Sequence, residues 1–352
     1  MIDVVYSFDN QVLATRIEEF CDNYNAEVDR FLRKSKGRKV DDFVDYTKLK
    51  WSRNLKRFLV AGKQLDYVSH NICQAIYRPF TKKYLYFAPI AIDEFGLFPH
   101  FFPRLNGVQE NLILWIKVGS DWPMFPLMSS YPVDYLPQGG SQCFPFYVYD
   151  EDGSNRRENI TDWALQQFRT HYADETISKW DIFYYVYGLL HHPGYRARYA
   201  DNLKRDLPRI PFAPDLRGFA DAGQKLADLH LNYETVEPHK LTWVCDDQVK
   251  MTYRVEKMRL SKDKTRLVVN NWLTLADIPA DVYEYRLGNR SALEWVIDQY
   301  QVKTDKRSGI VSDPNNADDP PYIVNLVERV VRVSLDTVNL VNALPSLLAG
   351  VG

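Results

Sequence analysis

Residues 178–194, SKWDIFYYVYGLLHHPG, contain the start, one face and the end of a helix in a single stretch. Ser178 and Asp181 have the S-x-x-D spacing of a capping box, in which two side chains satisfy the first free backbone N–H groups. Apolar side chains from Ile182 to Leu190 recur on one face, and Pro193-Gly194 interrupts the pattern. The stretch therefore predicts a capped helix that ends before Pro193.

Helical and extended patterns lie in separate blocks on both sides of this helix. Apolar periodicity and capping signals predict helices over 11–34, 46–61, 215–233, from Ser291 onward, and from about Tyr322 to Val341. Strands and loops are predicted over 76–150 and 241–287. Because the blocks segregate instead of alternating, the expected fold class is α+β, with mixed helices and antiparallel sheet, rather than a doubly wound sheet.

Within these blocks, one alternating segment and one division of the chain are specific expectations. Val249, Met251, Tyr253 and Val255 alternate with polar residues, which predicts a strand. The chain divides into two possible lobes. Residues 1–150 would hold N-terminal helices followed by a strand- and loop-rich part, and residues 151–352 a helical part with antiparallel strands and a C-terminal helix.

The composition is that of an ordinary globular protein, since 45% of the 352 residues are hydrophobic and 26% are charged. No window approaches the roughly 18 apolar residues that span a bilayer, and Met1–Asn10 lacks a signal-peptide pattern, so we expect no membrane partner. The four cysteines lie far apart, which indicates a reducing, cytoplasmic compartment. The net charge of −2 does not indicate a nucleic-acid-binding protein. Any DNA contact has to come from local patches or from a basic neighbouring domain.

The longest basic stretch covers residues 46–65, which hold six cations and no acid: Lys48, Lys50, Arg53, Lys56, Arg57 and Lys63. On a helix Arg53 and Arg57 lie one turn apart with Lys50 on the same side, as contact with a phosphate backbone requires. A solvated helix face is the alternative. The shorter run Arg33–Lys39 is followed at once by aspartates, which favours a solvated loop.

Two further segments combine features of nucleic-acid contacts with simpler structural explanations. Tyr77–Tyr84 interleaves aromatic residues with Arg78, Lys82 and Lys83, which suits a nucleic-acid groove or a strand and turn with inward-facing aromatics. Gly139–Pro145 is a glycine-rich turn in which Ser141 and Gln142 precede an apolar strand. Gln142 either pairs with adenine in the major groove or holds the turn in place. We expect loops within 100–145 to carry base recognition.

Catalytic, cofactor and metal sites are not expected in this chain. Asp319-Pro320-Pro321-Tyr322 has the form of the adenine methyltransferase motif, but residues 311–318 cannot form the apolar strand that precedes that motif, and Tyr322 begins a helical pattern. The adjacent His191 and His192 point apart on a helix and have no partner at metal-ligand spacing. No glycine-rich turn has the form of a P-loop or a cofactor site.

An ordered set of segments resembles one known family over nearly the whole chain. The segments are Tyr77–Phe80, Gly139–Pro145, Asn159–Ala164, Asp181–His191, Tyr195–Ala200, Leu207–Pro211, Ala227–Glu234, Ser291–Val296 and Val302–Lys306. Each alone is modest, and the ordered set is specific. The chain resembles the C-terminal specificity region, or target-recognition region, of type ISP restriction–modification enzymes, which join nuclease, helicase and adenine-N6 methyltransferase in one polypeptide.

The resemblance implies recognition of double-stranded DNA, and from the loop-rich pattern we expect the recognition part within residues 1–150. It also implies that the fragment alone is not an enzyme. Its partners would be duplex DNA and the methyltransferase and helicase domains of the same polypeptide. S-adenosylmethionine, ATP and Mg²⁺ would bind the upstream domains, and this fragment would hold no cofactor. Two alternatives remain: a stand-alone S-adenosylmethionine-dependent DNA adenine methyltransferase, and a structural coupling module that contacts no bases.

Overall fold

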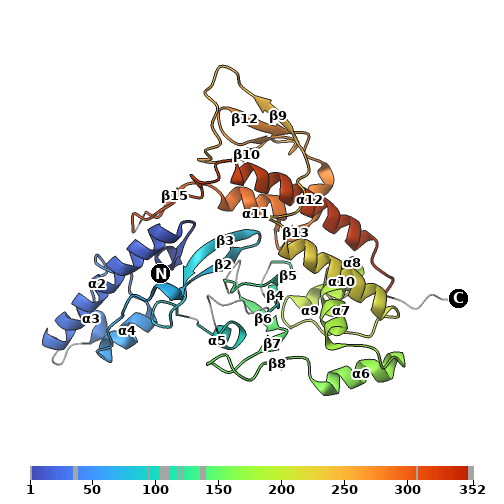
Figure 1. The fold of residues 1–352 in the computed structure, drawn as a ribbon, viewed down its shortest axis with the longest axis horizontal. Coiled ribbons are helices and arrows are strands. Elements are labelled where there is room, and N and C mark those ends of the chain that lie inside the picture. Colours follow the sequence, from blue (N-terminus) through green and yellow to red (C-terminus); the bar gives the residue numbers. More distant parts are fainter. Residues whose placement is uncertain are drawn as a thin grey trace.

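The computed structural model describes residues 2–34, 39–93, 95–103, 111–117, 119, 122–134, 140–306 and 308–347. Parts of three segments considered above, namely Arg33–Lys39, the loops of 100–145 and Gly139, lie outside the described residues. The chain has a roughly triangular outline, with N-terminal helices at one corner, a small sheet at the apex and a group of helices at the third corner (Figure 1). Small central sheets lie between the three corners.

The N-terminal corner is built on one long helix, as predicted. After α1 (Ile2–Val5) and β1 (Tyr6–Ser7), α2 (Asn10–Lys34) buries a face that includes Leu13, Ile17 and Tyr24. The short helices α3 (Val40–Phe43) and α4 (Arg53–Val60) follow.

The predicted helix over 46–61 is wrong in its first half. Ser52 caps α4 by accepting a hydrogen bond from the backbone N–H of Leu55 at 3.2 Å, and Asp45 accepts from the backbone of Thr47 in a preceding turn at 2.9 Å. Lys48 and Lys50 therefore precede the helix, and Lys50 is not on the same helix as Arg53.

Two small antiparallel sheets follow, in the region predicted to hold strands and loops. The first has the order β1-β3-β2, with β2 (Ile72–Arg78) following the 3₁₀ turn η1 (Ser69–Asn71) and joined to β3 (Thr81–Tyr86) by a tight turn. The second has the order β5-β4-β6. Its strands are β4 (Ile113–Lys117), β5 (Phe125–Ser129) and β6 (Ser141–Pro145). The neighbouring short elements are α5 (Phe98–Phe101), β7 (Tyr147–Val148) and β8 (Arg157–Glu158). An isolated parallel bridge joins Ile76 of β2 to Val133, in the segment that follows β5.

The third corner contains the helix predicted from residues 178–194. Ser178 and Asp181 form both bonds of the capping box at the start of α7 (Lys179–His191), and Pro193 is the first residue of the next helix. The helices around it are α6 (Asp162–Tyr172), α8 (Pro193–Arg198), α9 (Ala200–Leu203) and α10 (Leu216–Leu231). A Cβ atom on Gly223 would lie 1.9 Å from the backbone oxygen of Tyr184, so only glycine permits this close approach of α10 to α7.

The apex is a four-stranded antiparallel sheet of order β10-β11-β12-β9, above α11 and α12 in Figure 1. Its strands are β9 (Thr242–Cys245), β10 (Arg259–Leu260), β11 (Leu267–Val268) and β12 (Leu273–Ala276). The remaining elements are η2 (Ala280–Glu284), β13 (Arg286–Leu287), β14 (Arg290–Ser291), α11 (Ala292–Gln299), β15 (Lys303–Thr304), β16 (Val311–Ser312) and α12 (Tyr322–Asn342). The predicted capping box of Ser291 with Glu294 and the final helix are both confirmed.

The strand predicted over Val249–Val255 is wrong, because side-chain amides take the backbone hydrogen bonds of this segment. Asn315 accepts from the N–H of Val255 at 2.8 Å and donates to its carbonyl at 2.9 Å. Asn270 donates to the carbonyls of Thr252 and Arg254 at 2.9 and 3.0 Å. Alternating side chains do not make a strand when no neighbouring strand pairs with the backbone.

Two hydrophobic clusters form the core. One joins buried residues of 4–133 to those of 233–333. The other joins Leu114 and Ile116 of β4, Met128 of β5 and the preceding Met124 to the α6–α10 helices. Helices and small antiparallel sheets are segregated, which confirms the α+β class. The division into lobes 1–150 and 151–352 stays a prediction. Within the described residues, no helix is long and apolar enough to cross a membrane.

Candidate nucleic-acid interface

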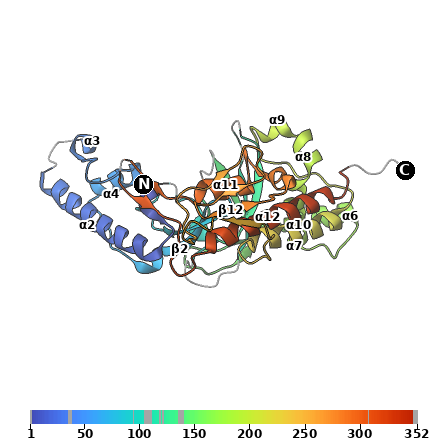
Figure 2. The same ribbon diagram turned by 90° about the horizontal axis from the view of Figure 1, so that it is seen from above.

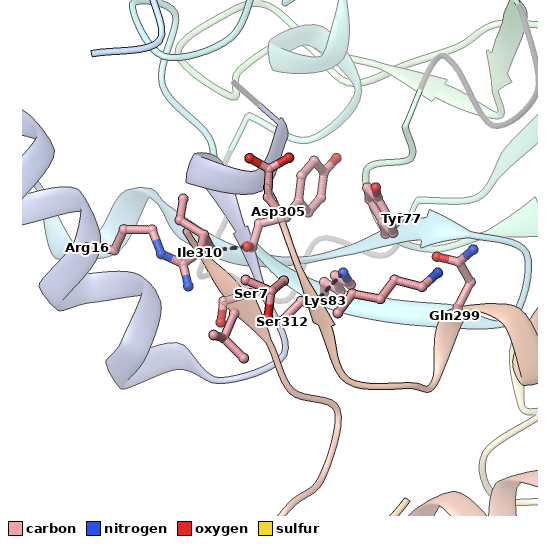
Figure 3. A pocket seen from close by; sticks show the side chains of 12 residues that line it. Ser7, Arg16, Tyr77, Lys83, Gln299, Asp305, Ile310 and Ser312 are labelled. Atoms are coloured by element: carbon pink, nitrogen blue, oxygen red, sulfur yellow. Dashed lines mark hydrogen bonds between the residues drawn. The ribbon is translucent and has the colours of Figure 1, made fainter. Parts of the chain in front are cut away.

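A polar groove follows strand β3 where the N-terminal corner meets the β15–β16 hairpin. It consists of two cavities of about 270 and 510 Å³ that share Lys83, and we call it the β3 groove. In the smaller cavity, Arg16 from α2, Lys83 from β3 and Gln299 from the end of α11 lie around residues of the hairpin (Figure 3). The cavity therefore draws its side chains from distant parts of the sequence.

The smaller cavity is the cationic end of the β3 groove. Arg16, Lys83 and Lys303 line it together with one carboxylate, that of Asp305. The Lys83 ammonium lies 4.3 Å from the ring centroids of both Phe8 and Tyr77 and 3.4 Å from the Ser312 hydroxyl. These contacts help to hold the ammonium at the cavity, because a cation is attracted to the faces of aromatic rings.

Lys303 is held among other cations. Burial lowers the pKa of its ammonium, the Asp298 carboxylate opposes this shift, and the neighbouring Arg290, Arg78 and Lys257 lower the pKa further. The ammonium also donates to the backbone oxygen of Asp298 at 2.8 Å. Lys303 also lies 3.9 Å from the Asp298 carboxylate, which Arg290 contacts at 2.8 Å, so its charge is partly balanced. The cavity itself is lined by three cations and one carboxylate.

The larger cavity is the amide end of the β3 groove. Five carboxamides line it: Asn10, Gln11, Gln74, Asn315 and Asn316. Carboxylates line it as well, including Glu234, which is ion-paired with Lys82 and accepts a hydrogen bond from the Tyr322 hydroxyl at 2.6 Å. The amide end offers donors and acceptors but, unlike the cationic end, it does not carry an excess of positive charge.

The predicted backbone-binding residues of the β2–β3 hairpin lie in or beside this groove. Lys82 and Lys83 line it, whereas Arg78 stacks on Tyr77 and forms an ion pair with Asp134 at 2.5 Å. Phe80, at the turn, is buried against Tyr233. The inward packing of an aromatic residue is therefore confirmed for Phe80, whereas nucleic-acid contact by Lys82 and Lys83 stays a prediction.

The six cations of residues 46–65 do not line the β3 groove. Lys48 lies 2.9 Å from the buried carboxylate of Glu27, and Lys56 lies 2.6 Å from Asp41. The remaining four are exposed on or next to α4: Lys50, Arg53, Arg57 and Lys63. Part of this basic stretch therefore secures α2 and α3, and part remains accessible to solvent.

Ser141 and Gln142 lie at the start of β6, an edge strand. Ser141 accepts a hydrogen bond from the indole N–H of Trp115 at 2.9 Å, which gives it a structural contact. Gln142 is exposed and lies opposite Ile116 of β4. Contact of Gln142 with a base stays a prediction.

Sequence patterns missed Arg16 and Lys303 because neither belongs to a basic run. Lys303 lies within a segment that carried the family resemblance, Val302–Lys306, but that segment gave no indication of its role. Only the pairing of β15 with β16 and the packing of β1 beside β3 bring these cations together.

Comparisons with known proteins agree in family and in fold. The family model of the type ISP C-terminal specificity domain matches residues 3–326. A nuclease-deletion mutant of the type ISP restriction–modification enzyme LlaGI, in complex with a DNA substrate mimic, is 36% identical with a TM-score of 0.86, over 98% of this chain and 32% of that one. A comparison with curated proteins finds no match.

Two further structures have the same TM-score of 0.86. The ATP-dependent type ISP enzyme LlaBIII bound to DNA is 30% identical, over 98% of this chain and 22% of that one. DrdV in a DNA complex is 32% identical, over 99% of this chain and 35% of that one. The chain thus spans about a third or less of the length of the proteins it resembles.

Proposed function

Because the chain belongs to the family of type ISP C-terminal specificity domains, we propose that it recognises a specific sequence in double-stranded DNA. The observation that carries this proposal is the similarity, over 98–99% of the chain, to three proteins whose structures contain DNA or a DNA mimic. The cationic end of the β3 groove supports it, since clustered Lys and Arg side chains are what a phosphate backbone requires.

In this proposal, backbone binding and base recognition are carried by different residues. Arg16, Lys83 and Lys303 hold a DNA strand by its phosphates, assisted by the predicted cations of the β2–β3 hairpin and of residues 48–63. Gln142, with Ser141 beside it, contacts a base edge. An exposed glutamine on an edge strand can both donate to and accept from adenine in the major groove.

The proposal extends to a longer protein. There, the domain presents its site to an adjacent adenine-N6 methyltransferase domain, and S-adenosylmethionine, ATP and Mg²⁺ bind outside the present chain. The fragment itself is expected to be inactive as an enzyme. This chain spans only 22–35% of the length of each relative, which supports placing the cofactor-binding domains outside it.

The contacts of Tyr322 argue against a stand-alone methyltransferase. Its hydroxyl donates to Glu234 at 2.6 Å and lies 3.4 Å from the Tyr300 hydroxyl, at the start of α12. Burial, together with Tyr300 and Glu234, raises the pKa of Tyr322 far above its usual value. A tyrosine held in this way is not free to stack on a flipped base.

The first experiment is selection from a library of randomised DNA duplexes by the purified chain, followed by sequencing. We expect enrichment of a short asymmetric motif. Binding without enrichment would instead favour the coupling module that contacts no bases. Titration with S-adenosylmethionine tests the alternative enzyme, and we expect no binding.

The second experiment tests presentation to a methyltransferase. The chain replaces the corresponding segment of LlaGI, and methylated adenines are mapped in DNA from cells that express the chimera. We expect methylation to move to the motif that the library selected. Continued methylation at the parent site by a folded chimera would contradict the proposal.

A further inference from the structure

A pocket of about 300 Å³, separate from the β3 groove, lies between the segment before β5, helices α8 and α9, and strand β13. We call it the Arg196 pocket. Three cations line it, Arg196, Lys204 and Arg286, and none of the described residues that line it is acidic. Its apolar lining residues are Trp122, Pro123, Met124, Ala200 and Leu203.

Arg196 has no ionic partner in the part of the chain that the structure describes. Its Nε donates to the backbone oxygen of Leu190 at 2.7 Å, which is a neutral acceptor. Burial lowers the pKa of the guanidinium, and the nearby hydroxyls of Tyr285 and Tyr187 oppose this shift. A cation that is partly removed from water without a counter-charge is costly, so the site favours an anion that can enter the pocket.

Two neutral groups beside Arg196 do not supply that charge. The Nε2 atom of His191 and the hydroxyl of Tyr285 are buried and find no hydrogen-bond partner among the described residues. Burial lowers the pKa of His191 far below its usual value, and Arg196 and His230 lower it further, so the imidazole is neutral. Burial raises the pKa of Tyr285, so its hydroxyl stays protonated.

The other two cations lie at more exposed positions. Arg286 donates to the backbone oxygen of Asn289, and Lys204 lies 2.9 Å from Asp201, whose side chain is almost fully exposed. Both contacts are on the surface and are easily exchanged for contacts with a ligand. Together with Arg196 they provide the donors of a phosphate site.

The apolar side of the pocket suits a planar ring. Trp122 is 41% exposed although it lines a cavity, and Met124 and Leu203 lie on the same lining. An exposed indole is a stacking surface for a nucleobase. The volume leaves room for more than a phosphate group and is near the lower limit for ligand pockets.

We propose that the Arg196 pocket binds one nucleoside phosphate unit, with the phosphate on Arg196, Arg286 and Lys204 and the base against Trp122. A paired base is stacked inside its duplex and cannot enter. The ligand is therefore either a free mononucleotide or an unpaired nucleotide of a DNA strand. This site goes beyond recognition of duplex DNA and does not depend on it.

The test is thermal unfolding of the full chain with about 10 mM deoxyadenosine 5′-monophosphate, a concentration that fills a millimolar site. Deoxyadenosine and inorganic phosphate serve as the two half-ligands. We expect the monophosphate to raise Tm, phosphate to raise it less, and deoxyadenosine to leave it unchanged. An equal rise with deoxyadenosine, or no rise with the monophosphate, overturns the proposal.

Three variants and one control locate the site. Arg286→Ala and Arg196→Met should each weaken monophosphate binding by about tenfold or more, the effect of losing a charged hydrogen bond. Trp122→Ala should weaken the binding of deoxyadenosine 5′-monophosphate but not that of inorganic phosphate. Arg198→Met changes an exposed arginine of the same helix that does not line the pocket, and it should bind like the parent.

Arg286 is exposed, so its variant tests the site even if Arg196→Met fails to fold. Unchanged binding by Arg286→Ala, or equal losses in Arg286→Ala and Arg198→Met, overturns the assignment. A duplex with one unpaired adenine, compared with the same duplex fully paired, identifies the source. If Arg286→Ala removes a preference for the unpaired duplex, the source is a DNA strand. Monophosphate binding without such a preference identifies free nucleotide.

Discussion

In residues 46–65 six cations follow closely along the chain, whereas at the cationic end of the β3 groove Arg16, Lys83 and Lys303 come from three distant segments. The basic stretch spreads its charges around a turn and a short helix, and two of them pair with Glu27 and Asp41. The groove concentrates its charges on one cavity. Cations that are close together in the sequence are therefore not always close together in space. A phosphate group is attracted by cations that are close together in space.

The largest expected effect concerns the structural part of the basic stretch. Glu27 is 2% exposed and accepts hydrogen bonds from Arg30 and Lys48. Glu27→Ala would leave these cations without their counter-charge and should lower the free energy of unfolding by about 2–3 kcal/mol. Denaturant titration measures this loss. Lys50→Ala, at an exposed position near Lys48, serves as the control and should change stability by less than about 0.5 kcal/mol.

Glu27 also predicts a dependence of stability on pH. Burial alone raises the pKa of its carboxyl, but hydrogen bonds from Arg30 and Lys48 outweigh burial and lower it. The pKa of Glu27 is therefore lower in the folded state than in the unfolded state. The stabilisation is fully present above the unfolded pKa, about 4.3, and is lost as the pH falls through the folded pKa. In Glu27→Gln this part of the acid sensitivity should disappear. An unchanged pH profile would show that the ion pair contributes nothing.

The next largest effect should be on DNA affinity. Replacing Lys83 and Lys303 together by alanine should weaken binding to every duplex by about 100-fold at low salt. The magnitude of the log–log salt slope should fall by about 2, one unit for each lost phosphate contact. Fluorescence anisotropy at several salt concentrations measures both quantities. A salt slope equal to that of the parent would remove the β3 groove from the interface.

A base-specific effect is expected at Gln142. If it contacts an adenine, Gln142→Ala should cost about 1–3 kcal/mol at one position of the motif and little at the others. The comparison variant is Gln74→Ala, which changes an exposed glutamine of strand β2 at the amide end of the groove. Library selection with both variants shows which replacement lowers the preference for one base in the selected motif. A lower Tm with an unchanged motif would instead assign Gln142 to holding the turn.

The smallest effect is expected from the exposed cations of the basic stretch. Lys50→Ala, Arg53→Ala and Arg57→Ala together should weaken binding to all duplexes by less than about tenfold, because exposed charges are strongly screened. The same salt titration measures this change. If the triple variant instead loses more affinity than the Lys83 and Lys303 double variant, the basic stretch contributes more to DNA affinity than the β3 groove does.

Local signals were reliable where a few neighbouring residues supply the whole interaction. Ser178 with Asp181 and Ser291 with Glu294 form capping boxes, and their bonds span only three residues. The final helix was also predicted almost to its ends. Ser52 was overlooked as a cap, so the helix over 46–61 was predicted seven residues too early.

Alternation was a weaker signal than capping. Val249–Val255 has the pattern of a strand, yet Asn270 and Asn315, the latter 60 residues away from Val255, occupy its backbone. A strand needs a partner for its backbone as well as a pattern of side chains. The sequence of this segment supplies the side-chain pattern but not the partner strand.

The sequence by itself determined the α+β class, the capped helices and the family, because these depend on residues close together or on an ordered set of motifs. Only the tertiary structure decided which cations share a cavity. Arg16, Lys83 and Lys303 meet because β3 lies beside β1 and the β15–β16 hairpin closes over it, and Arg196 meets Arg286 because α8 packs near β13. Electrostatic potential depends on distance in space, and long-range packing sets that distance.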